Sequence, residues 1–224
     1  FKKPLIVQRG TFRPVTKINQ SLIEKGLEQI QRLGDIQAKD PLPLMEITLK
    51  SIDSDNFSES EDILHRVETL TSLKIPVLIS RYTLFYELKQ FLRSCTDNVI
   101  GFVIGAAHLE KILDPKFYTH LPGGLLEAMG HLFDDKTGFL VYPFKDKSIC
   151  LTAGSFHPQT NFHHLYSFLV ASGRILDMAN CESIDTSVQS ENVRKLLQEG
   201  NSKWEELVPP SVARLIREKS FFKR

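Results

Sequence analysis

Basic and hydroxyl side chains follow several of the short apolar runs in this sequence. The first run is followed by Arg9, Gly10, Thr11 and Arg13, and later runs are followed by Lys50, Ser80, Arg81 and His108. Arginine offers a forked pair of donors to a phosphate, and the N–H groups of a helix start add more. In parallel α/β folds, ligands bind beyond the carboxyl ends of the strands. These residues therefore predict a phosphate-binding site, and ordinary solvated loop charges are the alternative.

One carboxylate and a group of histidines could also carry chemistry. Glu46 stands inside an apolar run, where an ionised carboxylate needs a partner or its pKa rises. Arg9 is the candidate partner, and the pair is either a structural ion pair or part of a tuned catalytic group. His157, His163 and His164 lie close in sequence. They lack the i,i+4 spacing of helical metal ligands, so we expect no metal site. One of these histidines could instead donate a hydrogen bond to a phosphate or act as a general acid.

The elements that must position these groups alternate along the chain. Strands are expected at 5–7, 44–49, 76–80, 99–105, 139–142 and 174–178, with helical spacing of apolar residues between most of them. Residues 149–153 are expected to form a further strand or an edge hairpin partner. The alternation predicts an α/β fold with an open, mostly parallel, doubly wound (Rossmann-like) sheet of five to six strands. A fragment of a (β/α) barrel is the alternative, since a full barrel usually needs about 250 residues.

The chain is expected to divide into two parts. Residues 1–181 form the predicted nucleotide- or phosphate-binding domain, and residues 182–224 carry only helical signals. We expect this C-terminal helical extension to pack on the sheet through Trp204, Leu207 and Leu215. It should contain a capping box at 202–205. The same apolar residues could instead dock a protein partner or a second copy of the chain.

The turn after the first strand carries a family resemblance. Gly10-Thr11-Phe12-Arg13-Pro14-Val15-Thr16-Lys17-Ile18-Asn19 is similar to the GxFxPx(H/T)xxH motif of the cytidylyltransferase-like nucleotidyltransferase superfamily. That group includes the nicotinate-nucleotide and pantetheine-phosphate adenylyltransferases. The resemblance implies a close approach of Gly10 to nucleotide phosphates, catalytic roles for Thr16, Asn19 and Arg13, and ATP with magnesium as cosubstrate. Asn19 replaces the final His of the motif and cannot supply an imidazolium charge, so nucleotide binding is expected more firmly than nucleotidyl transfer.

Composition narrows the range of partners. The 224 residues carry a net charge of +1, so no global field would attract nucleic acid or an anionic membrane. No apolar run approaches the roughly 18 residues needed to span a bilayer. The three cysteines form no CxxC pair, and we expect reduced thiols and a cytoplasmic location. The expected ligand is a nucleotide or small phosphorylated molecule. A non-catalytic interaction domain and a fragment of a phosphate-ester barrel enzyme are the alternatives.

Overall fold

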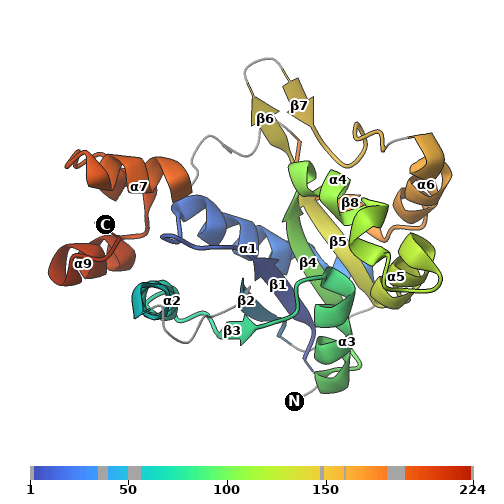
Figure 1. The fold of residues 1–224 in the computed structure, drawn as a ribbon, viewed down its shortest axis with the longest axis horizontal. Coiled ribbons are helices and arrows are strands. Elements are labelled where there is room, and N and C mark those ends of the chain that lie inside the picture. The colour runs from blue at the N-terminus through green and yellow to red at the C-terminus, as the bar shows by residue number, and fades with distance from the viewer. Residues whose placement is uncertain are drawn as a thin grey trace.

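A parallel sheet forms the centre of the protein (Figure 1). The computed structural model describes residues 3–34, 40–49, 57–146, 149–158, 160–180 and 190–222. Within these residues the sheet contains β1 (Leu5–Arg9), β2 (Leu42–Thr48), β3 (Val77–Ser80), β4 (Ile100–Gly105), β5 (Thr137–Tyr142) and β8 (Ile175–Asp177). The strand order is β3-β2-β1-β4-β5-β8, and all neighbours are parallel. This order confirms the predicted doubly wound sheet and excludes the closed sheet of a barrel.

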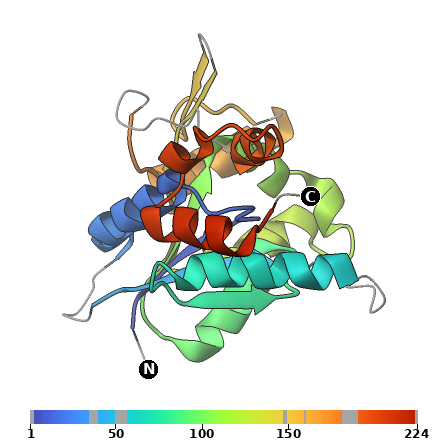
Figure 2. The same cartoon turned by 90° about the vertical axis from the view of Figure 1, so that its left-hand side faces the viewer.

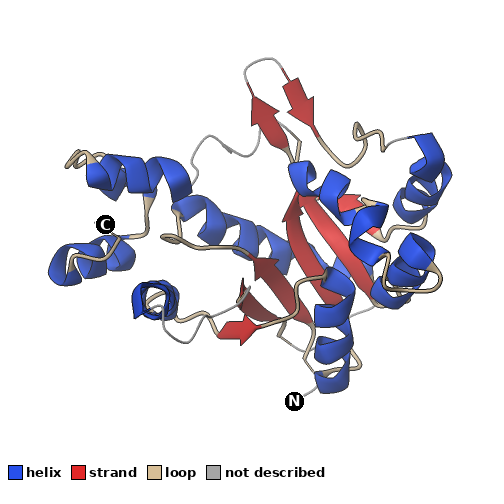
Figure 3. Cartoon of the chain, viewed as in Figure 1, coloured by secondary structure: helices blue, strands red, loops and turns tan. Residues whose placement is uncertain are grey.

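Helices cover both faces of the sheet (Figure 3). One face carries α1 (Lys17–Gln29), α2 (Phe57–Thr71), α7 (Ser190–Gln198), α8 (Trp204–Leu207) and α9 (Pro210–Lys219). The other carries α3 (Phe85–Cys95), α4 (Leu109–Ile112), α5 (Gly124–Leu132) and α6 (His163–Ala171). Short 3-10 helices are η1 (Ile30–Leu33), η2 (Ala106–His108), η3 (Pro115–Tyr118) and η4 (Thr160–Phe162). Each face has its own apolar core, as a doubly wound sheet requires.

The central strands are apolar because helices bury both of their faces. All six residues of β4 are buried. Phe102 and Ile104 point into one core and Val103 points into the other, which is why the run is continuous rather than alternating. After β3 at one edge, the chain returns through α3 to β4, on the far side of β1. The topological switch point of the sheet therefore lies between β1 and β4.

The C-terminal helices share a core with the sheet. Trp204 is 7% exposed and Val208 is 0% exposed. They belong to the same cluster as Met45 of β2. Figure 2 shows α9 lying alongside α2 in front of the sheet. Trp204 therefore packs as predicted, and Leu207 is half-buried and also packs against this cluster, whereas Leu215 is half-buried and is not part of it.

The extension begins its helices differently from the prediction. The capping box at 202–205 is not formed, because α8 starts after Lys203 and no side chain caps it. Pro210 opens α9, a position where its missing N–H costs no helical hydrogen bond. The predicted boundary at 181 lies outside the described residues, so the division into two parts stays a prediction.

A small antiparallel hairpin projects beyond the sheet (Figure 1). In it β6 (Phe144–Asp146) pairs with β7 (Ile149–Leu151), so the run at 149–153 provides a hairpin partner, one of the two predicted outcomes. Cys150 in β7 is disulfide-bonded, which corrects the expectation of reduced thiols, while Cys95 is a free and exposed cysteine. Among the helices of the described residues, none has both the length and the apolarity to cross a bilayer.

Candidate functional site

The turn after β1 is built around a buried aromatic side chain. Phe12 is 2% exposed and has a φ of 49°, a left-handed conformation that is uncommon for a bulky residue. A Cβ on Gly10 would lie 2.9 Å from the Phe12 ring, so glycine lets this ring pack against the backbone. The Gly10 N–H donates to the Glu46 carbonyl at 3.1 Å and extends the pairing of β1 with β2. Thr11 is exposed at the tip of this well-fixed turn.

Thr16 and Asn19, to which the family resemblance assigns catalytic roles, meet at the start of α1. The Thr16 N–H and its hydroxyl both donate to Asn19 Oδ1, each at 2.9 Å. The Asn19 N–H donates to Thr16 Oγ1 at 3.4 Å, which completes a capping box. Thr16 is 2% exposed. The side chains of this pair therefore hold each other and fix the helix start.

Arg9 and Ser80 do converge on an anion, and that anion is the buried carboxylate of Glu46. Arg9 Nε lies 2.7 Å from Glu46 Oε2, and Ser80 Oγ donates to Glu46 Oε1 at 2.6 Å. Thr48 Oγ1 donates to the same carboxylate at 2.9 Å. Glu46 is 0% exposed, so its charge needs these donors. The predicted pairing of Arg9 with Glu46 is confirmed, and it links β1, β2 and β3.

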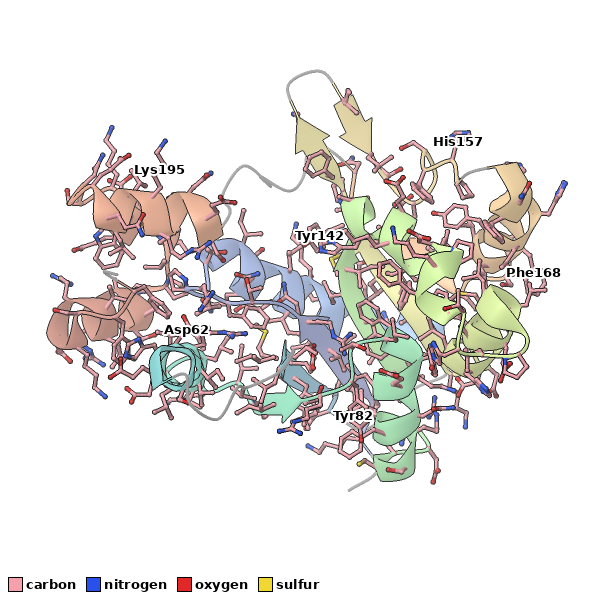
Figure 4. The ribbon with its side chains drawn as sticks, in the orientation of Figure 1. Asp62, Tyr82, Tyr142, His157, Phe168 and Lys195 are labelled. Carbon is pink, nitrogen blue, oxygen red and sulfur yellow. The ribbon has the colours of Figure 1, made fainter. Side chains whose placement is uncertain are left out.

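The other donors of Arg9 are occupied as well. Its Nη1 donates to the Thr83 carbonyl at 3.0 Å and its Nη2 to the Tyr82 carbonyl at 2.7 Å. Figure 4 labels Tyr82 in the segment between β3 and α3. The guanidinium also lies 4.7 Å from the centroid of the Phe85 ring. An external phosphate would have to compete with all of these contacts, so a ligand-binding role for Arg9 and Ser80 stays a prediction.

Arg13 belongs to a second charged group, which we call the Arg13–Asp62–Arg66 cluster. Arg13 Nε lies 2.7 Å from Asp62 Oδ1, and Arg66 Nη1 lies 3.6 Å from Asp62 Oδ2. Figure 4 places Asp62 on α2. Arg66 is 9% exposed, and its Nε has no hydrogen-bond partner. Burial lowers the pKa of Arg66, Asp62 opposes this shift, and Arg13 adds to it. Among the described residues, two guanidinium groups share one carboxylate here.

The carboxyl end of β4 lies on the other side of the switch point. His108 ends η2 and has an exposed side chain, yet desolvation lowers its pKa, the charge of Lys111 lowers it further, and a hydrogen bond with the Gly105 backbone partly opposes the shift. The lowered pKa favours the neutral form of the ring, which offers a hydrogen bond, over the charged form. Tyr142 from β5 packs over Gly105, where a Cβ would lie 3.0 Å from the ring (Figure 4). Burial raises the pKa of Tyr142.

The remaining predicted residues lie apart from these groups. Arg81 is exposed after β3, and Lys50 lies outside the described residues. His157 Nδ1 is 2.8 Å from the Ser155 carbonyl, and the rings of His163 and His164 are 5.6 Å apart. In the part of the chain that the structure describes, no three His, Cys, Asp or Glu side chains gather as a metal site.

Two residues of the site have no signature in the sequence. Asp62 and Arg66 stand four residues apart on α2, which is the ordinary spacing of a solvated helical pair. Their importance comes from Arg13, which lies 49 residues before Asp62 in the chain. Only the folded arrangement brings these groups together.

The motif pattern itself occurs twice in the chain. Gly154-Ser155-Phe156-His157-Pro158-Gln159-Thr160-Asn161-Phe162-His163 repeats the spacing of Gly, Phe, Pro and Thr and keeps the final His. However, β7 precedes this copy, and β7 belongs to the hairpin and not to the central sheet. The N–H groups of Ala153 and Gly154 already donate to the carboxylate of Asp177. The copy at 10–19 is distinguished by its place at the switch point, which the pattern alone does not reveal.

The strand order, with helices on both faces of the parallel sheet, defines an open, doubly wound (Rossmann-like) α/β fold. Two solved structures of Plasmodium falciparum nicotinic acid mononucleotide adenylyltransferase are similar to this chain. One is complexed with APC (TM-score 0.54) and the other with NaAD (TM-score 0.55); each is 13% identical and covers 98% of this chain and 97% of its own. At this identity the likeness establishes the fold. No protein-family model and no curated protein sequence matches the chain.

Proposed function

We propose that this protein binds a nucleotide or another small phosphorylated molecule at the switch point between β1 and β4. One observation carries the proposal: the strand order places the turn at 10–15 and the start of α1 beside the carboxyl end of β4. In doubly wound sheets this crevice is where ligands bind. The similar adenylyltransferase structures are complexes with APC and NaAD, which supports a nucleotide as the ligand class.

The local charge supports an anionic ligand although the whole chain is nearly neutral. In the ion pairs of the described residues, the three charges of Arg9, Arg13 and Arg66 are matched by two carboxylates, those of Glu46 and Asp62. The first turn of α1 contains no acidic residue, so its N-terminal partial positive charge is not offset. A phosphate beside Arg13 and the exposed hydroxyl of Thr11 would balance this excess.

Nucleotidyl transfer would be a more specific function of the same site. The residues at the start of α1 indicate that its rate is low. Asn19 can donate a hydrogen bond through its amide group, but it carries no positive charge to stabilise a transferring phosphoryl group. Its carbonyl oxygen is committed to Thr16. The proposed function is therefore binding, with transfer reduced or lost.

Thermal unfolding tests the binding proposal. Millimolar ATP with magnesium, AMP and nicotinate mononucleotide should each be tried, because a ligand at 100 times its Kd stabilises the native state by about 2.7 kcal/mol. The substitution Arg13→Gln should reduce the ligand-induced rise in Tm. Arg214→Gln, on the exposed side of α9, is the matched control and should leave that rise unchanged. Unchanged Tm values with all three compounds would contradict the proposal.

A separate assay addresses transfer. Pyrophosphate release from ATP in the presence of nicotinate mononucleotide measures adenylyl transfer directly. We expect saturable binding together with little or no release. Release at a rate typical of enzymes, about 1 per second or more, would show that Asn19 is compatible with efficient transfer.

A further inference from the structure

A cavity separate from the switch-point residues lies between α4, η3 and the segment before α6. Its volume is about 100 Å³. Glu110, Asp114 and Pro115 line one side, and Phe156, Pro158 and Phe162 line the other. Figure 4 labels His157, which stands between two of these residues in the chain. The two walls come from segments more than 40 residues apart in sequence, so the fold itself creates the cavity.

The apolar walls are held in place by the core behind them. The Phe156 ring makes an edge contact with the Tyr166 ring at a centroid distance of 5.1 Å. Tyr166 is buried, and its hydroxyl donates to the Ala153 carbonyl at 2.7 Å. Leu113, at the back of the cavity, is 4% exposed. Such a preformed aromatic wall loses little entropy when a ligand binds.

The charges at this cavity are negative. None of its lining residues is basic, and two of them are carboxylic acids. Asp114 is partly neutralised, because Lys116 Nζ lies 2.5 Å from its Oδ2. A hydrogen bond from Lys116 also lowers the pKa of Asp114, so this group stays ionised. Glu110 is exposed on α4 and supplies the second negative charge. A phosphate would meet repulsion here, whereas a cation would be attracted.

We propose that this cavity binds a small organic cation, namely an alkyl- or quaternary ammonium group with a compact apolar body. Aromatic faces attract such cations, and nearby carboxylates add to the attraction. Phe156 and Phe162 supply the aromatic lining, the prolines and Leu113 supply apolar contact, and Glu110 supplies a negative charge. This site goes beyond the proposed nucleotide function, because its electrostatics are opposite to those of the Arg13–Asp62–Arg66 cluster.

An NMR titration with choline tests the proposal. The matched neutral probe is 3,3-dimethyl-1-butanol, which has the same shape without the charge. We expect saturable shifts of the amide signals of residues 110–115 and 156–162. Choline should bind at least about 5-fold more tightly than the neutral probe, within the range expected for a cation over aromatic rings. Equal affinities, or the absence of saturable shifts in these segments, would refute the proposal.

Two variants separate the contribution of the negative charge from that of the aromatic ring, and neither should unfold the protein. Glu110→Gln should weaken choline binding roughly 2- to 5-fold and leave the neutral probe unaffected, as expected for an exposed charge. Glu218→Gln on α9 is the matched control and should change neither affinity. Phe162→Leu keeps an apolar side chain but removes the aromatic ring, and it should reduce the preference of the cavity for choline over the neutral probe. If Glu110→Gln and Phe162→Leu both leave that preference intact, the cavity does not recognise the cation.

Discussion

Replacing Arg9 should destabilise the whole protein rather than merely weaken ligand binding. Arg9→Met removes the partner of a fully buried carboxylate and three hydrogen bonds of 2.7–3.0 Å. Breaking a buried ion pair in this way usually costs about 3–5 kcal/mol. Because the Arg9 side chain is 15% exposed, water can relieve part of the penalty. We therefore expect the free energy of unfolding to fall by about 3 kcal/mol.

Urea unfolding followed by circular dichroism measures this loss, and a double variant controls for it. Glu46→Gln together with Arg9→Met removes both charges, while the amide can still bond to Ser80 and Thr48. The double variant should be more stable than Arg9→Met alone by at least about 1 kcal/mol, since coupled neighbours are not additive. A loss below about 1 kcal/mol for Arg9→Met, combined with loss of nucleotide binding, would refute this reasoning. Arg9 would then be a ligand group.

Three other changes have definite expected outcomes. Asn19→His should raise adenylyl transfer by about 100-fold or more if a missing imidazole limits the reaction, as measured by pyrophosphate release; an unchanged rate would mean that other groups are also lost. Burial raises the pKa of Tyr118 to about 12, and its hydroxyl donates to the Ile112 carbonyl. The folded pKa is above the unfolded value of 10.0, so the contribution of the Tyr118 hydroxyl to the free energy of unfolding should be complete below pH 10 and lost as the pH rises towards 12. The free energy of unfolding of Tyr118→Phe, measured over the same pH range, should not show this loss. Deleting residues 200–224 should abolish cooperative unfolding, because Trp204 and its neighbours belong to the core; a folded truncated protein would instead favour a docking role for this segment.

The architecture could be predicted from the sequence because each layer leaves a local pattern. A strand buried on both faces, such as β4, has to be apolar without interruption. Alternation of such runs with helical stripes then allows few topologies. The same reasoning placed Glu46 next to Arg9, because an acidic residue inside an apolar strand demands a partner.

The details of the site could not be predicted, because they depend on side chains that are distant in sequence. Arg13 was expected to face an external phosphate, yet Asp62 contacts it, and no local feature of the sequence indicates this pair. The motif was equally ambiguous. Its more complete copy, at 154–163, follows a hairpin strand, whereas the copy with Asn19 stands at the switch point. Topology decides which copy can meet a ligand, and spacing alone does not.

Glu46 has a consequence for the lifetime of the protein in a cell. A ligand that binds only the native state stabilises it, so a protein whose clustered cations depend on a bound anion unfolds and is degraded more often when that anion is scarce. Here a carboxylate of the chain itself already satisfies Arg9 and Ser80. The abundance of this protein should therefore depend less on the supply of its ligand.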